Sequence, residues 1–199
     1  MPKGFTQAEK EQIQRDLLLK GKALIIENGF KKTSVSSITK AVGIAKGSFY
    51  MFYESKEELF IDILEDIESR IQAEMLREIE DSFLPADALL KNLLKSRLRS
   101  VMEDEILAMT LNTDLIQDVW SKLPEKRQKA NIKRDEVFLE AFLEKRPEAS
   151  KIFSHGTEKL AGIFRGLFFL IVHRSEIGDE SFEAVLDFMV DASVDKLFK

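Results

Sequence analysis

Apolar residues recur every three or four positions along most of the chain, the spacing that predicts α-helices. Near the N-terminus, Ile13, Leu17 and Leu24 fall on one face of such a helix. Gly29 is expected to end this helix, and Phe30 behind it to pack into the core. No stretch alternates apolar and polar residues as a half-buried strand does, and no repeat interrupts the pattern. The pattern therefore predicts an all-α protein.

Two sequence motifs mark where long helices begin. Thr6 with Glu9, and Ser55 with Glu58, have the spacing of a capping box, in which each side chain bonds the other residue's backbone N–H. The first motif predicts a helix that starts after Thr6. The second predicts a long helix that continues to about Ile79.

Two short helices are predicted between these long ones. The first covers about 36–42 and ends at Gly43, because a tight turn favours a residue that tolerates positive φ. The second starts near Ala45 or Lys46 and ends before Glu54. Two short helices joined by a glycine turn, with a longer helix on each side, are typical of a helix-turn-helix.

The rest of the chain is also predicted to be helical, with prolines at 85, 124 and 147 where a helix can start or must stop. In all, we expect about nine helices in two domains. The first domain covers 1–54, with the helix-turn-helix at about 34–53, and the second is a helical domain over 55–199. The later helices are expected to begin near Pro85 and to cover 106–123, 125–146, 152–174 and 182–198.

Charge is distributed unevenly along the chain. Residues 1–53 hold nine Lys and Arg against four Asp and Glu, whereas the other 146 residues hold 21 against 31, within a net charge of −5. Only the first domain is therefore expected to meet a polyanion such as nucleic acid. Lys91, Lys95 and Arg99 share a helical face that is expected to lie in solvent. The absence of cysteines, of an apolar signal segment and of a membrane-length apolar stretch favours an intracellular protein.

The string VGIAKGSFY, residues 42–50, has the chemistry expected of a DNA recognition helix. Such a helix enters the major groove with hydrogen-bond donors and small residues near its N-terminus. Lys46 supplies a cation, Gly47 allows a close approach, and Ser48 and Tyr50 supply hydroxyl groups. Phe49 is expected to face the core.

Further donors cluster at the starts of the neighbouring helices. Thr33, Ser34 and Ser36 precede or open the first short helix, where hydroxyls and free N–H groups can meet a phosphate. Ser34 suits turn chemistry better than a direct contact. Lys56 stands in a similar place at the start of the long helix.

Residues 33–60, TSVSSITKAVGIAKGSFYMFYESKEELF, closely resemble the DNA-binding signature of the TetR family of transcriptional regulators, and the resemblance extends over roughly 7–63. It implies a cytoplasmic homodimer in which residues 46–52 of each subunit enter one major groove of a palindromic double-stranded operator. It also implies a ligand-responsive regulator, commonly a repressor, that a small effector bound to the C-terminal domain releases from DNA. By position, the DNA contacts would be Thr33, Ser34, Ser36, Lys46, Gly47, Ser48, Tyr50, Met51 and Lys56.

Three positions depart from the family pattern. Ala45 stands where the family usually has Ser or Thr, so the second short helix lacks an N-cap side chain, a loss of ~1 kcal/mol. Met51 and Phe52 follow Tyr50, where the family often places His or Tyr, so a phosphate donor is missing. Tyr53 is expected to take over part of that role.

The C-terminal domain is expected to hold the dimer interface and the effector site. The helix over 152–174 presents small residues, which allow close helix approach, and the helix over 125–146 supplies aromatic ones. These two helices from each subunit would form a four-helix dimer interface. Its residues would be Phe138, Phe142, Ala161, Gly162, Gly166 and Leu170, although the glycines equally suit internal packing. A pocket for a hydrophobic effector would draw on Met102, Met109, Asn112, Trp120, Phe164 and Phe168, although residues of these types more often belong to a plain core.

Two other classes of function stay open at this point. An enzyme is disfavoured, because the two histidines lack zinc-site spacing and no phosphate-binding glycine loop follows a strand. Accordingly, no metal or cofactor is expected. The second alternative is a helical interaction module that has lost its affinity for DNA. The departures at Ala45, Met51 and Phe52 leave this alternative open. Salt-dependent DNA binding separates a regulator from such a module.

Overall fold

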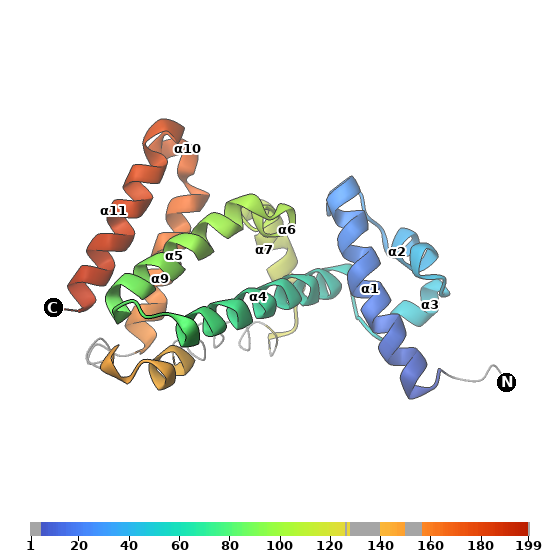
Figure 1. Ribbon diagram of the computed structural model, residues 1–199. Coiled ribbons are helices and arrows are strands. Elements are labelled where there is room, and N and C mark those ends of the chain that lie inside the picture. The colour runs from blue at the N-terminus through green and yellow to red at the C-terminus, as the bar shows by residue number, and fades with distance from the viewer. Residues whose placement is uncertain (1–4, 126, 128–139, 150–156, 199) are drawn as a thin grey trace. The chain divides into compact units, whose positions relative to one another are not determined.

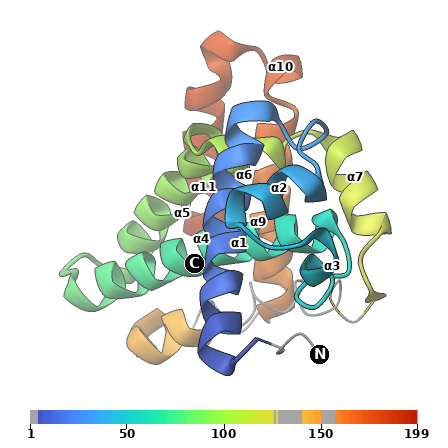
Figure 2. The same cartoon turned by 90° about the vertical axis from the view of Figure 1, so that its right-hand side faces the viewer.

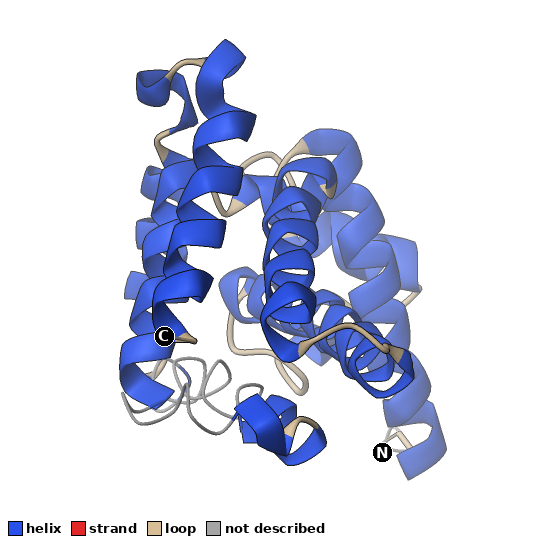
Figure 3. Cartoon of the chain, turned by 60° about the vertical axis from the view of Figure 1, so that its left-hand side comes forward, coloured by secondary structure: helices blue, strands red, loops and turns tan. Residues whose placement is uncertain are grey.

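The structure is a computed structural model that describes residues 5–125, 127, 140–149 and 157–198. Every regular element in these ranges is a helix (Figures 1 and 3), as the apolar spacing predicts. The helices are α1 (Gln7–Asn28), α2 (Val35–Val42), α3 (Lys46–Phe49), α4 (Lys56–Asp81), α5 (Ala86–Glu103), α6 (Glu105–Met109), α7 (Thr113–Ser121), α9 (Thr157–Val172), α10 (Arg174–Ile177) and α11 (Asp179–Leu197).

The chain divides into two compact units. One comprises residues 1–68 with 117–123, and the other comprises 69–116 with 124–199. The boundary between the units therefore falls within α4 rather than before it. The first turns of α4 belong to the first unit because Leu59, Phe60 and Ile63 are buried there.

The first unit contains α1, α2 and α3, with α1 packed against α2 and α2 against α3 (Figure 2). Leu17, Ile25, Ile38 and Phe49 are fully buried and form its core. Of the residues predicted for the inner face of α1, Leu17 is buried, while Ile13 and Leu24 are half-buried. Burial of apolar side chains from all these helices provides the main stabilisation of the unit.

A glycine brings α1 close to α4. A Cβ placed on Gly21 would lie 3.1 Å from Leu59 Cδ2 and 3.5 Å from Ile63 Cδ1. A larger residue at this position would push these side chains away, so the absence of a side chain permits the close approach of the two helices.

The capping-box predictions are confirmed at one helix and corrected at the other. At α1, the Thr6 hydroxyl accepts from the Glu9 N–H, and the Glu9 carboxylate accepts from the Thr6 N–H at 2.7 Å. At α4, the Ser55 hydroxyl accepts from the Glu58 N–H at 3.1 Å. The Glu58 carboxylate, however, accepts from the N–H of Glu54 at 2.7 Å, one residue earlier than a capping box requires.

The helix predicted over 106–123 is two helices. The Asp104 carboxylate caps α6, and the Thr110 hydroxyl donates to the Leu107 carbonyl oxygen at 2.5 Å. The Asn112 amide oxygen then accepts from the Leu115 N–H at 2.9 Å at the start of α7. These short polar side chains hydrogen-bond the nearby backbone in place of the continuous helical ladder, which breaks the predicted helix.

In the second unit, α5, α9 and α11 pack against one another. Leu89, Leu93, Phe182 and Leu186 are fully or almost fully buried. Residues 152–156 of the helix predicted over 152–174 lie outside the described residues; the rest of that range holds α9 and the start of the one-turn α10. α11 begins at Asp179, three residues before the predicted start. The predicted helix over 125–146 lies largely outside the described residues; among those that are described, 125, 127 and 140–145 are helical and 146 is not.

Lys91, Lys95 and Arg99 pair with acidic residues of α11, which corrects the expectation that they lie in solvent. Lys91 Nζ lies 2.5 Å from an Asp195 carboxylate oxygen, and Lys95 Nζ lies 2.8 Å from one of Asp191. Arg99 contacts Glu183 at 3.1 Å and Asp187 at 2.8 Å. We call this row of ion pairs the α5–α11 charge ladder.

Candidate nucleic-acid interface

The helix α3 buries one side and exposes the other. Phe49 is fully buried and Tyr53 is 3% exposed, whereas Tyr50 and Met51 are 54% and 58% exposed. Lys46 and Gly47 are also exposed. Because residues three and four apart share a helix face, Gly47, Tyr50 and Met51 present one surface. The predicted recognition residues are thus brought together on the outside of a well-anchored turn.

The turn before α3 depends on a glycine in the left-handed region. Gly43 has φ 87° and ψ 27°, and its N–H donates to the Thr39 carbonyl oxygen at 2.9 Å. The Ile44 N–H donates to the same oxygen at 3.0 Å. Lys20 of α1 donates to the Ala41 carbonyl oxygen at 3.0 Å and so satisfies another group at the end of α2. These hydrogen bonds satisfy the carbonyl oxygens at the end of α2 and hold the first residues of the turn that leads to α3.

The start of α2 uses some of the predicted contact residues internally. Ser34 is the N-cap, and its hydroxyl accepts from the Ser37 N–H at 3.1 Å. Thr33 is 3% exposed, and its hydroxyl donates to the carbonyl oxygens of Leu24 and Gly29 at 3.1 Å and 3.0 Å. Ser36 is exposed in the first turn. Of these hydroxyls, that of Ser36 is therefore the best placed for a phosphate.

Lys56 also forms internal contacts. Its Nζ donates to the carbonyl oxygens of Phe30 and Thr33 at 2.7 Å and 2.8 Å and lies 4.1 Å from the centre of the Phe30 ring. Burial lowers the pKa of the Lys56 amine from its ordinary value. Lys56 therefore connects the start of α4 to the segment between α1 and α2.

The structure shows the consequences of Ala45, which departs from the family pattern, and the position of Tyr53, which was expected to supply the missing phosphate donor. Ala45 is the N-cap of α3, and no side chain caps that helix. The Tyr53 ring packs 5.8 Å from the Phe49 ring, and burial raises the pKa of its phenol. Since Tyr53 is 3% exposed, it does not offer the phosphate contact expected of it.

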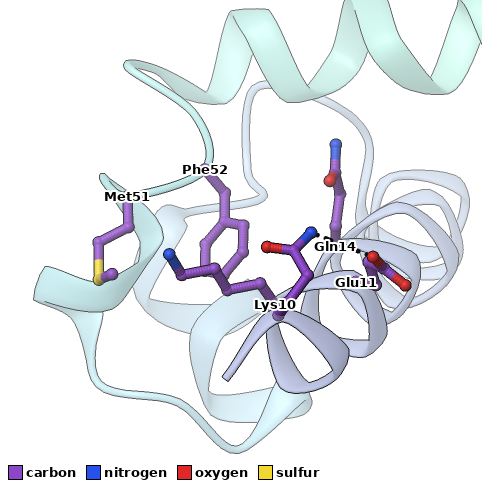
Figure 4. A pocket seen from close by; sticks show the side chains of 6 residues that line it. Lys10, Glu11, Gln14, Met51 and Phe52 are labelled. Carbon is purple, nitrogen blue, oxygen red and sulfur yellow. Dashed lines mark hydrogen bonds between the residues drawn. The ribbon is translucent and has the colours of Figure 1, made fainter. Parts of the chain in front are cut away.

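A shallow hollow of about 260 Å³ lies beside the exposed face of α3 (Figure 4). It is lined by polar residues from the first turns of α1 and by Met51 and Phe52 from the turn after α3. Sequence reasoning did not identify this hollow, because the residues on its two sides lie about 40 positions apart. The full lining set is Gln7, Lys10, Glu11, Gln14, Met51 and Phe52.

The residues predicted for an effector pocket lie in varied surroundings. Met102, Met109, Trp120, Phe164 and Phe168 are half-buried, and Asn112 is exposed as the cap of α7. Another hollow, of about 110 Å³ in the second unit, has a largely polar lining that includes none of these six. Its lining residues are Ile71, Glu74, Met75, Glu78, Ser96, Arg97 and Ser100.

The residues predicted for a dimer interface divide by exposure. Phe142 and Ala161 are fully buried within the protomer, Gly162 and Gly166 are exposed, and Leu170 is half-buried. Phe138 lies outside the described residues. Sequence reasoning missed the exposed Phe169 of α9 and the exposed Phe188 and Met189 of α11. Helical periodicity could have placed Phe169 on the same face as Gly162 and Gly166.

Neither a membrane-spanning helix nor a metal-binding cluster occurs in the described part of the chain. None of its helices combines the length and apolar character needed to cross a membrane. Nor do three or more His, Cys, Asp or Glu side chains gather among those residues in a way that could hold a metal ion.

Comparisons with known proteins agree on one class. Residues 17–63 match the family described as bacterial regulatory proteins, tetR family. The transcriptional repressor DhaR of Mycobacterium sp. strain GP1 is 32% identical over 80 residues, 40% of each chain. The transcriptional regulator QacR of Staphylococcus aureus strain Mu50 is 37% identical over 57 residues, 29% of this chain and 30% of QacR. The chain thus spans less than half the length of these relatives.

A solved structure extends the similarity of fold to nearly the whole chain. FadR of Bacillus subtilis, crystallised with stearoyl-CoA, superposes with a TM-score of 0.56 and 20% identity, covering 96% of this chain and 98% of FadR. At this identity the likeness concerns the fold alone.

Proposed function

We propose that this chain is a transcriptional regulator of the TetR family, which its residues 17–63 match, and that it binds a palindromic DNA operator as a homodimer. Bound at the operator, it represses transcription. A small hydrophobic effector bound in the second unit releases it. The relatives named above are regulators and not enzymes, and the proposal accordingly includes no catalysis.

The exposed face of α3 is the observation that supports the proposal most strongly. Lys46, Gly47, Tyr50 and Met51 project from a turn whose inner side is fixed by the buried Phe49. A Cβ placed on Gly47 would meet nothing within 4 Å, so packing within the chain does not require a glycine there. A partner that approaches the backbone closely, such as the edge of a base pair, gives the glycine a role.

The set of residues proposed to contact DNA is smaller than the set predicted from sequence. Lys46, Gly47, Tyr50 and Met51 face the major groove, and Ser36 meets a phosphate, with Ser48, which is half-buried, at the margin. Thr33, Ser34 and Lys56 support this surface from within through the hydrogen bonds described above.

Dimerisation is proposed to involve α9 and α11. Phe169 and Phe188 are 60% and 70% exposed, and Met189 is 39% exposed. On α9, the exposed Gly162 and Gly166 would let a helix of the partner approach closely. Exposed large apolar side chains are typical of interaction surfaces, and closed two-fold dimers are the commonest oligomers.

The effector is proposed to be hydrophobic and to occupy the second unit. Met102, Met109, Phe164 and Phe168 are half-buried there, and such residues suit an apolar ligand. The FadR structure with stearoyl-CoA provides an example of this fold holding a ligand with a long acyl chain.

Selection of binders from a random double-stranded DNA library at near-physiological salt tests the proposal. We expect enrichment of a palindrome whose half-sites bind one subunit each. Enrichment of nothing, or binding only at low salt without sequence preference, would instead favour the helical interaction module that lacks a working DNA surface.

A further inference from the structure

The hollow beside α3 is formed by two different chemical surfaces. On one side, Phe52 is half-buried, and its ring centre lies 6.5 Å from that of Phe5. On the other side, α1 contributes Gln7, Lys10 and Gln14, which can donate hydrogen bonds. Figure 4 shows the amine of Lys10 extending past Phe52 toward Met51. The ammonium of Lys10 therefore lies at the edge of the proposed DNA surface, next to the apolar side of the hollow formed by Phe52.

Lys10 is exposed, and among the described residues its ammonium has no hydrogen-bond or ion-pair partner. The neighbouring acidic residues form hydrogen bonds with other side chains and backbone groups and not with Lys10. The Glu11 carboxylate accepts from the Gln7 amide at 3.0 Å, and the Glu9 carboxylate is held by Thr6 in the capping box. The ammonium of Lys10 is consequently available to an anion from outside the chain.

The turn after α3 lacks a donor of its own at this place. The side chains of Met51 and Phe52 have no polar hydrogen, their backbone N–H groups donate to the carbonyl oxygens of Ser48 and Phe49, and Tyr53 is buried. A duplex whose major groove receives α3 places its sugar–phosphate backbone beside the ends of that helix, where the hollow lies. The side chain of Lys10 can lay its methylene groups along Phe52 and keep its charge outward.

We propose that Lys10 binds a backbone phosphate of the operator and thereby supplies, from α1, the phosphate contact that the turn after α3 lacks. The inference rests on the proposed function, since it requires α3 to enter the major groove. Glu11, in the same hollow, opposes this contact through its negative charge. The two residues should therefore change DNA binding in opposite directions.

The dependence of operator affinity on salt tests the contact. For B-DNA, each neutralised phosphate contributes about −0.9 to the slope of log K against log salt. Loss of one contact per subunit should make the slope of a dimer shallower by about 2, and should raise Kd about 30-fold at 0.15 M salt with the difference vanishing near 1 M. Fluorescence anisotropy on the selected palindrome measures both quantities.

The variants separate a phosphate contact from a structural role. Lys10→Ala should show the shallower slope on both the palindrome and a scrambled duplex, and Lys10→Arg should restore the wild-type slope. Glu11→Gln should strengthen binding. Arg77→Ala, which removes an exposed cation from the second unit, should leave the slope unchanged. Circular dichroism melts should be the same for wild type and the Lys10 variants.

Each outcome bears on one of the two proposals. A wild-type protein without salt-dependent, sequence-specific binding would overturn the proposed function. A wild type that binds the palindrome steeply, with an unchanged slope in Lys10→Ala, would overturn the role of Lys10 and leave the proposed function standing.

Discussion

The ammonium of Lys56 lies 4.1 Å from the centre of the Phe30 ring and donates a hydrogen bond to the carbonyl oxygen of the same residue at 2.7 Å. The same amine donates to the Thr33 carbonyl oxygen at 2.8 Å. The sequence suggested that Lys56, at the start of α4, contacts phosphate. In the structure its amine instead forms hydrogen bonds within the first unit.

Replacing Lys56 by methionine is expected to lower the free energy of unfolding by about 1 to 3 kcal/mol, because two hydrogen bonds from a charged group are lost. The apolar part of the side chain is kept. Urea denaturation measures the change. The salt dependence of DNA binding should stay that of the wild type, measured at a temperature where both proteins are folded. Unchanged stability with a shallower salt slope would show that Lys56 contacts phosphate after all.

Gly43 and Gly47 form a matched pair for separating fold from recognition. Gly43→Ala places a side chain at φ 87° and should cost about 1 to 2 kcal/mol of stability. Gly47→Ala adds a methyl in open space within a helix and should leave stability unchanged or raise it by up to about 1 kcal/mol. Thermal melts and operator affinity should be measured for both.

Only the second variant should weaken DNA binding while keeping full stability, because its methyl group would stand between α3 and the bases. If Gly47→Ala binds the operator as tightly as wild type, the face of α3 does not approach DNA closely.

The α5–α11 charge ladder should stabilise the second unit weakly. Arg99 and Asp187 are each more than a third exposed, so their coupling in a double-mutant cycle with alanine should be about 0.5 to 1 kcal/mol. It should shrink in 1 M NaCl because of screening. The pair Arg99 and Asp179, whose carboxylate instead contacts Arg174, supplies the control and should show no coupling. A coupling that persists in high salt would contradict this account.

Phe188→Glu is expected to dissociate the dimer, since it places a charge in the proposed interface of α11. The dimer Kd should rise about 30-fold or more, as for a hot-spot residue. Sedimentation velocity at micromolar concentration measures the change. Phe83, fully exposed between α4 and α5, provides the control, and Phe83→Glu should stay dimeric. If both variants sediment like the wild type, α11 is not the interface.

The helix-turn-helix could be predicted because its signals are local. A glycine that permits positive φ, hydroxyl residues at helix starts and an alternation of buried and exposed aromatic residues all act within a few positions. Gly43, Ser34 and Phe49 accordingly lie where the sequence places them. The all-α class follows from the apolar spacing in the same way.

Other features depend on segments far apart in the chain. The helical spacing of Lys95 and Arg99 shows that they share a face, but their partners Asp191 and Asp187 lie about 90 residues later. Likewise, a hydroxyl such as that of Thr33 suits a phosphate or a carbonyl oxygen equally well. Its inward direction is set by the packing of α1, which sequence spacing alone does not specify.

The most direct test of the account is the operator affinity of Lys46→Ala, measured on the selected palindrome and on a scrambled duplex at 0.15 M salt. Lys46 is the exposed cation at the start of α3. Its loss should weaken the binding free energy for the palindrome by about 1 to 3 kcal/mol, which raises Kd roughly 5- to 150-fold. The Kd for the scrambled duplex should change far less, and the dimer should stay folded. Equal affinity of variant and wild type for the palindrome would contradict the assignment of α3 as the recognition helix.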